Sequence, residues 1–174
     1  MLTWWNLAGV PFVYSFNSFY IAKFNPHNPN ALNVLCLVLL LTAYYIWDTA
    51  QSQKARFRMQ LRGEMPQRKA FPQLPWGTLK NPKYLKTKAG TPLLIDGWWQ
   101  YAQKIHYACD VVMALVWGLA CGFGNFLPYF YVCFFSLMIT HRSSRDNERC
   151  HAKYGTDWEK YSAIVPWRFV PFIW

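Results

Sequence analysis

The most constraining feature of the sequence is an abrupt change in charge after position 140. Residues 111–140 contain no charged side chain, whereas residues 141–161 carry a charge at almost every second position. An uncharged stretch of that length suits a membrane interior but is too long for one straight helical span of about 20 residues. The sequence Gly122-Phe-Gly-Asn-Phe-Leu-Pro128 interrupts it near the middle. We therefore predict a membrane hairpin over 111–140, followed by a charged cytosolic segment.

The same alternation of apolar and basic stretches runs through the rest of the chain. Residues 4–22 and 31–47 are two further candidate spans, whereas residues 48–88 are basic, contain proline and hold no candidate span. Residues 98–110 predict an aromatic helix at the membrane interface. Because basic loops face the cytosol, the spans are expected in pairs.

The predicted fold class is therefore all-α: a polytopic membrane helix bundle of about four membrane segments, with a cytosolic basic loop and a C-terminal helix. Both termini are expected in the cytosol. The expected organisation is two spans in residues 1–50, a cytosolic or interfacial basic segment in 51–110, the hairpin in 111–140 and a cytosolic tail in 141–174.

The net charge of +10 does not by itself indicate a nucleic-acid-binding protein. The basic residues flank apolar segments, and no stretch outside the bundle can fold around a core of its own.

The five cysteines show no Cys-x-x-Cys spacing and no zinc-like pairing with histidine. We therefore expect buried thiols, with neither a disulfide framework nor a metal site. The N-terminus lacks a basic region before its aromatic segment, so no cleavable signal is expected.

The segment after the hairpin predicts a helix with a ligand-binding face. Residues three or four apart share one side of a helix, and Gly155 is the expected stop. The face carries two guanidinium groups, a carboxylate, a thiol and a phenol: Arg142, Arg145, Asp146, Cys150 and Tyr154. Trp158 and Tyr161 follow on a second short turn. Such a face suits a phosphate-bearing cofactor, although a helix end of this composition can also serve only to anchor the last span.

Two other groups of residues could bind the same ligand. Lys54 and Arg58 are four residues apart, so on a continuing helix they could clamp a phosphate; the alternative is attraction to lipid headgroups. The second group is mainly aromatic: Leu94, Trp98, Trp99, His106 and Tyr107. Interfacial tryptophans are usually anchors, but they can also stack on a nicotinamide or adenine ring, with His106 offering hydrogen bonds. Asp110, at the entry to the hairpin, is either a cap partner or a functional group.

Several motifs together resemble a known family. They are Leu93-Leu-Ile-Asp-Gly-Trp-Trp99, His106-Tyr-Ala-Cys-Asp110, Leu127-Pro-Tyr-Phe-Tyr131, His141-Arg-x-x-Arg-Asp-x-x-x-Cys-x-x-Lys-Tyr-Gly155 and Val165-Pro-Trp-Arg-Phe-Val-Pro-Phe-Ile-Trp174. This set resembles the sterol reductases, which include sterol C14 reductase, 7-dehydrocholesterol reductase, lamin B receptor and the fungal C24(28) reductase. Trp5-Asn-Leu-Ala-Gly-Val-Pro-Phe-x-Tyr14 and Lys104-Ile-His-Tyr107 are most similar to the fungal C24(28) branch, which catalyses the last step to ergosterol.

The resemblance implies a multi-pass enzyme of the endoplasmic reticulum membrane that reduces a sterol carbon–carbon double bond with NADPH. A sterol substrate and membrane lipid are the implied partners. For a side-chain methylene, the expected chemistry is protonation at C28 followed by hydride delivery to C24. The implied cofactor contacts are Lys54, Arg58, Leu94, Trp99, His106, Tyr107, Arg142, Asp146, Cys150, Tyr154 and Tyr161. Asp146 is the predicted acid, with Tyr154 and Tyr161 as alternatives.

The chain departs from the family pattern in length and at a few positions. Family members are longer, so the resemblance implies the C-terminal, cofactor-binding half, with the missing N-terminal half or other sterol-pathway enzymes as partners. His106 stands where relatives have Asn, and Gln103-Lys104 where many have Arg-His, changes that fit the C24(28) branch. Two alternatives stay open: a non-catalytic or truncated remnant that binds sterol or cofactor, and a membrane methyltransferase similar to the isoprenylcysteine carboxyl methyltransferases. S-adenosylmethionine carries no phosphate for Lys54 and Arg58, which counts against the second.

Overall fold

The computed structural model describes residues 10–64 and 74–171 of the chain. They belong to two compact units. Unit 1 is built from the chain up to Thr42 and from residues 111–140, and unit 2 from residues 43–110 and from 141 onward. Helices α3, α4 and α5 each continue from one unit into the other. The division of the chain into membrane and cytosolic segments stays a prediction.

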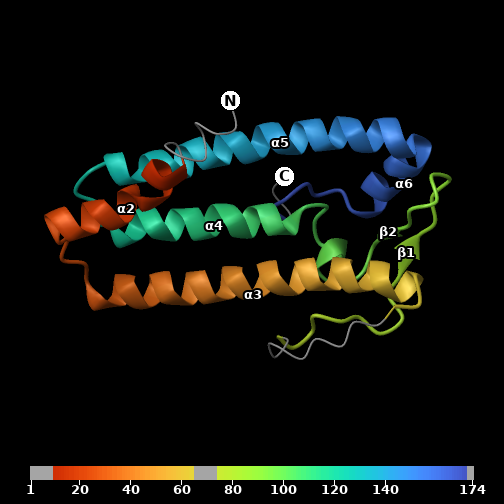
Figure 1. Ribbon diagram of the computed structural model, residues 1–174, viewed down its shortest axis with the longest axis horizontal. Coiled ribbons are helices and arrows are strands. Elements are labelled where there is room, and N and C mark those ends of the chain that lie inside the picture. The colour runs from red at the N-terminus through yellow and green to blue at the C-terminus, as the bar shows by residue number, and fades with distance from the viewer. Residues whose placement is uncertain (1–9, 65–73, 172–174) are drawn as a thin grey trace. The chain divides into compact units, whose positions relative to one another are not determined.

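The chain is mostly helical, as the sequence predicts, but it also contains a small β-ribbon that the sequence does not predict. In chain order the elements are α2 (Val10–Phe24), α3 (Asn30–Leu61), β1 (Tyr84–Leu85), β2 (Leu93–Leu94), the 3-10 turn η2 (Gly97–Gln100), α4 (Ile105–Ala120), the 3-10 turn η3 (Leu127–Tyr129), α5 (Phe130–Tyr154) and α6 (Thr156–Ile164) (Figure 1). Residues 4–9 of the first predicted span lie outside the described residues, as does the first half of the motif that begins at Trp5.

Helix α3 is the one helix, among the described residues, that is long and apolar enough to cross a membrane by length and composition. Its apolar side chains point outward: Leu37 is 55% and Leu41 59% exposed. The core helix of a soluble protein would bury such side chains. Beyond Trp47 the helix continues without a break through the basic residues to Leu61. The four-segment bundle remains a prediction.

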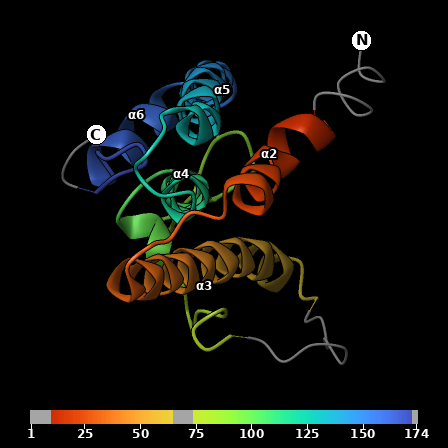
Figure 2. The same cartoon turned by 90° about the vertical axis from the view of Figure 1, so that its left-hand side faces the viewer.

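Unit 1 contains the turn of the predicted hairpin, which lies where the sequence placed it. Helix α4 ends at Ala120 and α5 begins at Phe130, and the connection between them faces the viewer in Figure 2. Gly122 has a φ of +74°, and its carbonyl accepts a hydrogen bond of 3.2 Å from the Tyr129 hydroxyl. The two helices contact each other through the stacked rings of Trp117 and Tyr131, whose centroids are 5.4 Å apart. The chain therefore reverses direction between residues 120 and 130.

Unit 2 contains the β-ribbon, which packs against α6 (Figure 1). β1 and β2 pair antiparallel, with Tyr84 opposite Leu94 and Leu85 opposite Leu93. Leu85, Leu93 and Ile95 of the ribbon pack on a buried cluster of Trp158, Tyr161 and Val165 from α6 and its end. Strands of two residues are too short to give the alternating pattern by which strands are recognised in a sequence.

The predicted interfacial helix over 98–110 is wrong in its first half. Residues 97–100 form a 3-10 turn, and α4 begins only at Ile105. Hydrogen bonds to α3 divert the chain: the indole N–H groups of Trp98 and Trp99 donate to Thr49 Oγ1 (2.8 Å) and to the Ala50 carbonyl (2.9 Å). These contacts hold residues 98 and 99 on α3, and the helical axis of α4 begins only after them.

Gly97 makes this diversion possible, and we expect it to be the least replaceable glycine of unit 2. Its φ is +61°, and a Cβ here would overlap Gln53 Oε1 and lie 2.9 Å from Gln53 Cδ. Gly97→Ala should therefore lower the free energy of unfolding by roughly 2–4 kcal/mol. Gly90→Ala is the matched control, because Gly90 has a similar φ of +75° and no atom lies within 4 Å of the position that its Cβ would take. That variant should lose only about 1 kcal/mol from backbone strain.

The measurement is thermal unfolding in detergent, followed by tryptophan fluorescence. The melting temperature should fall several degrees further for Gly97→Ala than for Gly90→Ala. Equal losses in the two variants would contradict the close approach of Gly97 to Gln53.

Candidate functional site

A pocket with a volume of about 240 Å³ lies within unit 2. Its walls come from four stretches that are distant in sequence: the basic end of α3, the segment around β2, the junction of η2 with α4, and the end of α5 with α6. Every predicted cofactor contact except Arg142 lines it: Lys54, Arg58, Leu94, Trp99, His106, Tyr107, Asp146, Cys150, Tyr154 and Tyr161. Arg142 is exposed and lies beside the pocket, its guanidinium carbon 5.8 Å from the centre of the Tyr107 ring.

The pocket also has walls that the sequence did not predict as site residues. These are Phe57, Thr91, Pro92, Leu93, Gln103, Lys104 and Trp158. Of these, Lys104 brings a charge into the site. Lys104 stands two residues before His106, in the motif Lys104-Ile-His-Tyr107. Its positive charge within that motif could have identified it as a site residue. Arg145, predicted on the same helical face as Asp146, is exposed and does not line the pocket.

One side of the pocket is cationic. Lys54 and Arg58 lie one helical turn apart on α3, beyond its apolar stretch, as the spacing predicted. The Lys54 ammonium lies 4.1 Å from the centre of the Trp99 ring, which is buried. Burial, together with the charge of Arg58, lowers the pKa of Lys54 to about 8. An anionic ligand would offset both effects and favour the charged amine.

His106 is a neutral hydrogen-bonding group in this cationic site. Burial and the charge of Lys54 lower its pKa to about 4, so the imidazole is uncharged at neutral pH. Its ring lies between those of Trp99 and Tyr107, at centroid distances of 5.5 and 4.4 Å. Its Nδ1 atom is buried and has no hydrogen-bond partner within the described parts of the chain. A buried nitrogen of this kind fits a hydrogen bond from a bound ligand.

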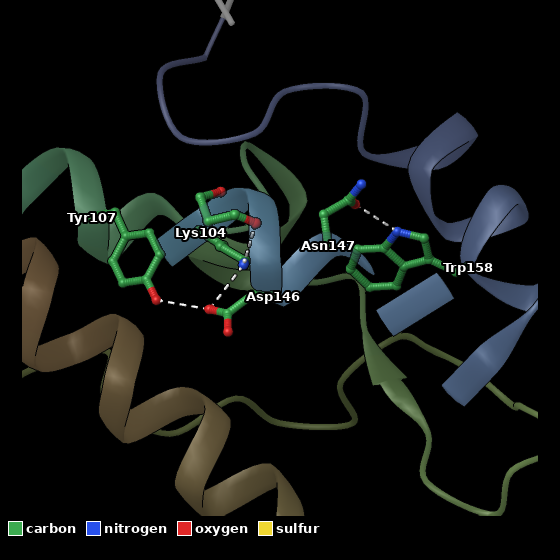
Figure 3. A network of polar contacts seen from close by, with 6 residues as sticks. Lys104, Tyr107, Asp146, Asn147 and Trp158 are labelled. Atoms are coloured by element: carbon green, nitrogen blue, oxygen red, sulfur yellow. Dashed lines mark hydrogen bonds and ion pairs between the residues drawn. The ribbon is translucent and has the colours of Figure 1, made fainter. Parts of the chain in front are cut away.

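Asp146 is the centre of a second polar group in the pocket (Figure 3). Its Oδ2 accepts hydrogen bonds from Lys104 Nζ at 3.1 Å and from the Tyr107 hydroxyl at 3.0 Å. Burial opposes ionisation of Asp146, but these hydrogen bonds and the charges of Lys104 and Arg142 outweigh it and hold the pKa below its usual value. Burial and the hydrogen bond to Asp146 raise the pKa of Tyr107 to about 12. The proton of this pair is therefore carried by the tyrosine.

This proton distribution bears on the predicted role of Asp146. Asp146 is a hydrogen-bond acceptor in this network, and it would have to gain a proton, through Tyr107 or from a ligand, before acting as an acid. Its assignment as the acid stays a prediction.

An aromatic wall closes the side formed by α5 and α6. The Trp158 ring stacks on Tyr161 at 5.0 Å and on Tyr154 at 6.3 Å. The Trp158 indole N–H donates to Asn147 Oδ1 at 2.9 Å, which fixes the ring (Figure 3). Gly155, with a φ of +53°, ends α5 and lets α6 turn back, so the predicted helix stop is confirmed. Flat rings fixed in this way can stack on an aromatic part of a ligand.

The arrangement suits a ligand that combines negative charge with an aromatic ring. Lys54 and Arg58 offer charge-assisted hydrogen bonds to phosphate, the aromatic side chains offer stacking surfaces, and His106 offers an unused nitrogen. Within the described residues, no group of three or more His, Cys, Asp or Glu side chains could hold a metal ion. The charges and rings that line the pocket are compatible with an organic anion.

A model of the Ergosterol biosynthesis ERG4/ERG24 family matches residues 1–174. The chain belongs to this family. Delta(24(24(1)))-sterol reductase erg4A of Aspergillus fumigatus is 46% identical over 175 residues, which cover 98% of this chain and 37% of that protein. Delta(24(24(1)))-sterol reductase of Gibberella zeae is 44% identical, over 99% of this chain and 29% of the relative. Delta(14)-sterol reductase erg24 of Schizosaccharomyces pombe is 41% identical, over 100% of this chain and 38% of the relative.

The chain thus spans roughly a third of the length of these sterol reductases, between 29% and 38%, and matches a C-terminal portion of them. That share is smaller than the half expected from the sequence. The family motif Leu93–Trp99 has a structural explanation: it supplies β2, an Asp96 carboxylate that accepts from Gly97 N at 2.7 Å, and the two tryptophans held against α3.

The ion pair of Lys104 with Asp146 yields a prediction for the pKa of Asp146. Lys104→Met removes a hydrogen bond and a positive charge, so the pKa of Asp146 should rise, whereas Lys104→Arg should leave it low. The measurement is a carboxyl-carbon NMR titration of aspartate-labelled protein, with Asp146→Asn used to assign the signal. An unchanged pKa of Asp146 in Lys104→Met would contradict the account of this network.

Proposed function

We propose that this chain is the cofactor-binding part of an NADPH-dependent sterol reductase of the endoplasmic reticulum membrane. The sterol bond that we propose is C24(28), reduced in the last step of ergosterol biosynthesis. The observation that carries the proposal is the convergence of Lys54, Arg58, Trp99, His106 and Asp146 on one pocket. The names of the Aspergillus and Gibberella relatives support the choice of bond.

The pocket residues offer contacts for the phosphates, the rings and a hydroxyl or amide group of NADPH. Lys54 and Arg58 would bind phosphate, with Arg58 able to do so in bidentate fashion. Trp99 and the aromatic wall around Trp158 would stack on the rings of NADPH. The Nδ1 atom of His106 would hydrogen-bond to a hydroxyl or amide group of the cofactor. NADPH, when bound, supplies the hydride, and the protein supplies binding, orientation and electrostatics.

The Tyr107–Asp146 pair would hold and move a proton beside this cofactor. An isolated alkene needs a proton before it accepts hydride, so the site must contain an acid as well as a hydride source. Asp146 is our candidate. It would receive the proton of the Tyr107 hydroxyl, which lies 3.0 Å from its Oδ2, and Tyr107 would take up a proton from water in turn. The remainder of a longer protein, or another chain of the sterol pathway, would complete the pocket for the sterol.

The alternatives make different predictions. A non-catalytic remnant would bind NADPH or sterol without turnover. A methyltransferase would bind S-adenosylmethionine, which leaves Lys54 and Arg58 without a phosphate, and the family match counts against it.

The lowered pKa of Lys54 makes NADPH binding depend on pH. If the ammonium form binds the phosphate, the dissociation constant should rise about tenfold between pH 7 and pH 9, as an amine with a pKa of about 8 loses its proton. The pKa values of His106 and Tyr107, about 4 and about 12, lie outside this window. Lys54→Arg is the control, because arginine stays charged and should remove the dependence. The measurement is a titration of NADPH fluorescence with protein in detergent, and an identical pH profile in Lys54→Arg would contradict the role of Lys54.

A chimera tests the reaction itself. Residues 1–174 replace the matching C-terminal portion of the Aspergillus fumigatus relative, and the chimera is expressed in a fungal strain that lacks C24(28) reductase. Ergosterol should replace the 24(28)-unsaturated precursor, and Asp146→Ala in the chimera should abolish the conversion. A chimera that reaches the membrane and binds NADPH while the precursor accumulates would favour the remnant. An unchanged rate in Asp146→Ala would remove Asp146 from the mechanism.

A further inference from the structure

Three aromatic side chains outside the pocket form a continuous surface on unit 2. Trp76 and Tyr101 are 45% and 43% exposed, and Trp98 lies between them, with ring centroids 4.9 Å from Trp76 and 6.2 Å from Tyr101. None of the three lines the pocket. Tyr44 of α3 adds a further exposed ring, at 52%. Large aromatic side chains rarely gather on a surface that faces only water.

Hydrogen bonds hold this surface against one stretch of α3. The Tyr45 hydroxyl donates to the Pro75 carbonyl and Gln53 Nε2 donates to the Trp76 carbonyl, each at 2.9 Å. The Trp98 indole donates to Thr49 Oγ1 on the same helix. Trp76 adopts a φ of +69°, which is costly for a bulky residue. The structure thus holds Trp76 in an unfavourable conformation with nearly half of its surface exposed.

The level along α3 at which the aromatic surface is held indicates what this surface contacts. The apolar stretch of the helix ends at Trp47, and the hydrogen bonds fall between Tyr45 and Gln53, a distance of about 12 Å at 1.5 Å per residue. The aromatic surface therefore lies beside the last apolar turn and the two turns that follow. Tryptophan and tyrosine favour this level of a membrane, because their rings are apolar while the N–H or O–H group stays hydrated.

We propose that Trp76, Trp98 and Tyr101, together with Tyr44 and Tyr45, form an interfacial anchor that inserts into the headgroup region of the bilayer. The sequence alone indicates Tyr44 and Tyr45 at the end of a span. Trp98 and Tyr101 lie in the segment that the sequence predicts at the interface. The structure adds Trp76 and brings these three rings together at the level of Tyr44 and Tyr45. The anchor fixes how far unit 2 stands from the membrane.

This placement has a consequence for the pocket. Lys54 lies about 10 Å and Arg58 about 16 Å along α3 beyond Trp47, at 1.5 Å per residue. The cationic side of the pocket is then in the aqueous phase close to the headgroups, where a water-soluble anion reaches it without entering hydrocarbon. The anchor itself depends only on α3 crossing the membrane, and not on the identity of the ligand.

Fluorine NMR of fluorotryptophan-labelled protein in phosphatidylcholine nanodiscs tests the anchor. Trp76→Phe assigns the Trp76 signal, and Trp76→Tyr serves if the first variant does not fold. Three relaxation agents are compared: a lipid nitroxide near the headgroup, a lipid nitroxide at the chain end, and a gadolinium chelate in water. The Trp76 signal should broaden at least about twofold more with the headgroup nitroxide than with either other agent. Trp158, which is 4% exposed on α6, is the internal control and should broaden less than Trp76 with the headgroup nitroxide.

Two outcomes would overturn the proposal. Strongest broadening by the gadolinium chelate would mean that Trp76 is in water, and insensitivity to all three agents would mean that protein covers it. Labelling also replaces Trp99 and Trp158 of the pocket, so NADPH binding is measured on labelled and unlabelled protein. Binding to the unlabelled protein separates failure of the anchor from failure of the proposed cofactor site.

Discussion

The contact of Gly97 with Gln53 is the constraint on which most of unit 2 depends. Gln53 is 1% exposed, and its side chain hydrogen-bonds to the backbone of Trp76 and of Trp98. One buried amide therefore joins α3, the segment around Trp76 and η2. A side chain at position 97 would separate these elements. The close contact of Gly97 with Gln53 also places the Trp99 ring against the Lys54 ammonium, on the cationic side of the pocket.

The charges of the pocket follow from this packing. Lys54, Arg58 and Lys104 all line one small space, and Asp146 is the carboxylate among its lining residues. The site lowers the pKa values of Lys54 and His106 and raises that of Tyr107. Such a site attracts anions, and it stores a proton on a tyrosine beside an ionised carboxylate. Both properties are compatible with the proposed function, which requires a phosphate-bearing ligand and a proton near it.

Much of this site could be predicted from the sequence, because most of its residues lie on helices with regular spacing. Asp146, Cys150 and Tyr154 follow one another at intervals of four on α5, and Gly155 ends the helix, as expected. The family motifs then connected these helical residues to Leu94 and Trp99 in the segments between helices. The path of the chain between residues 95 and 105 could not be predicted, since hydrogen bonds to α3, about 50 residues earlier, decide it. The β-ribbon and the Lys104 ion pair depend on such distant contacts as well.

The most direct test of the account is the binding of NADPH to the purified chain. We predict saturable binding of one NADPH per chain, with the fluorescence of Trp99 quenched in proportion, and loss of binding when Lys54 and Arg58 are both replaced by glutamine. The double variant should keep the melting temperature of the parent, because both residues lie at the pocket surface. Binding that is unchanged in a folded Lys54→Gln, Arg58→Gln variant, or no saturable binding in the parent, would contradict the assignment of this pocket.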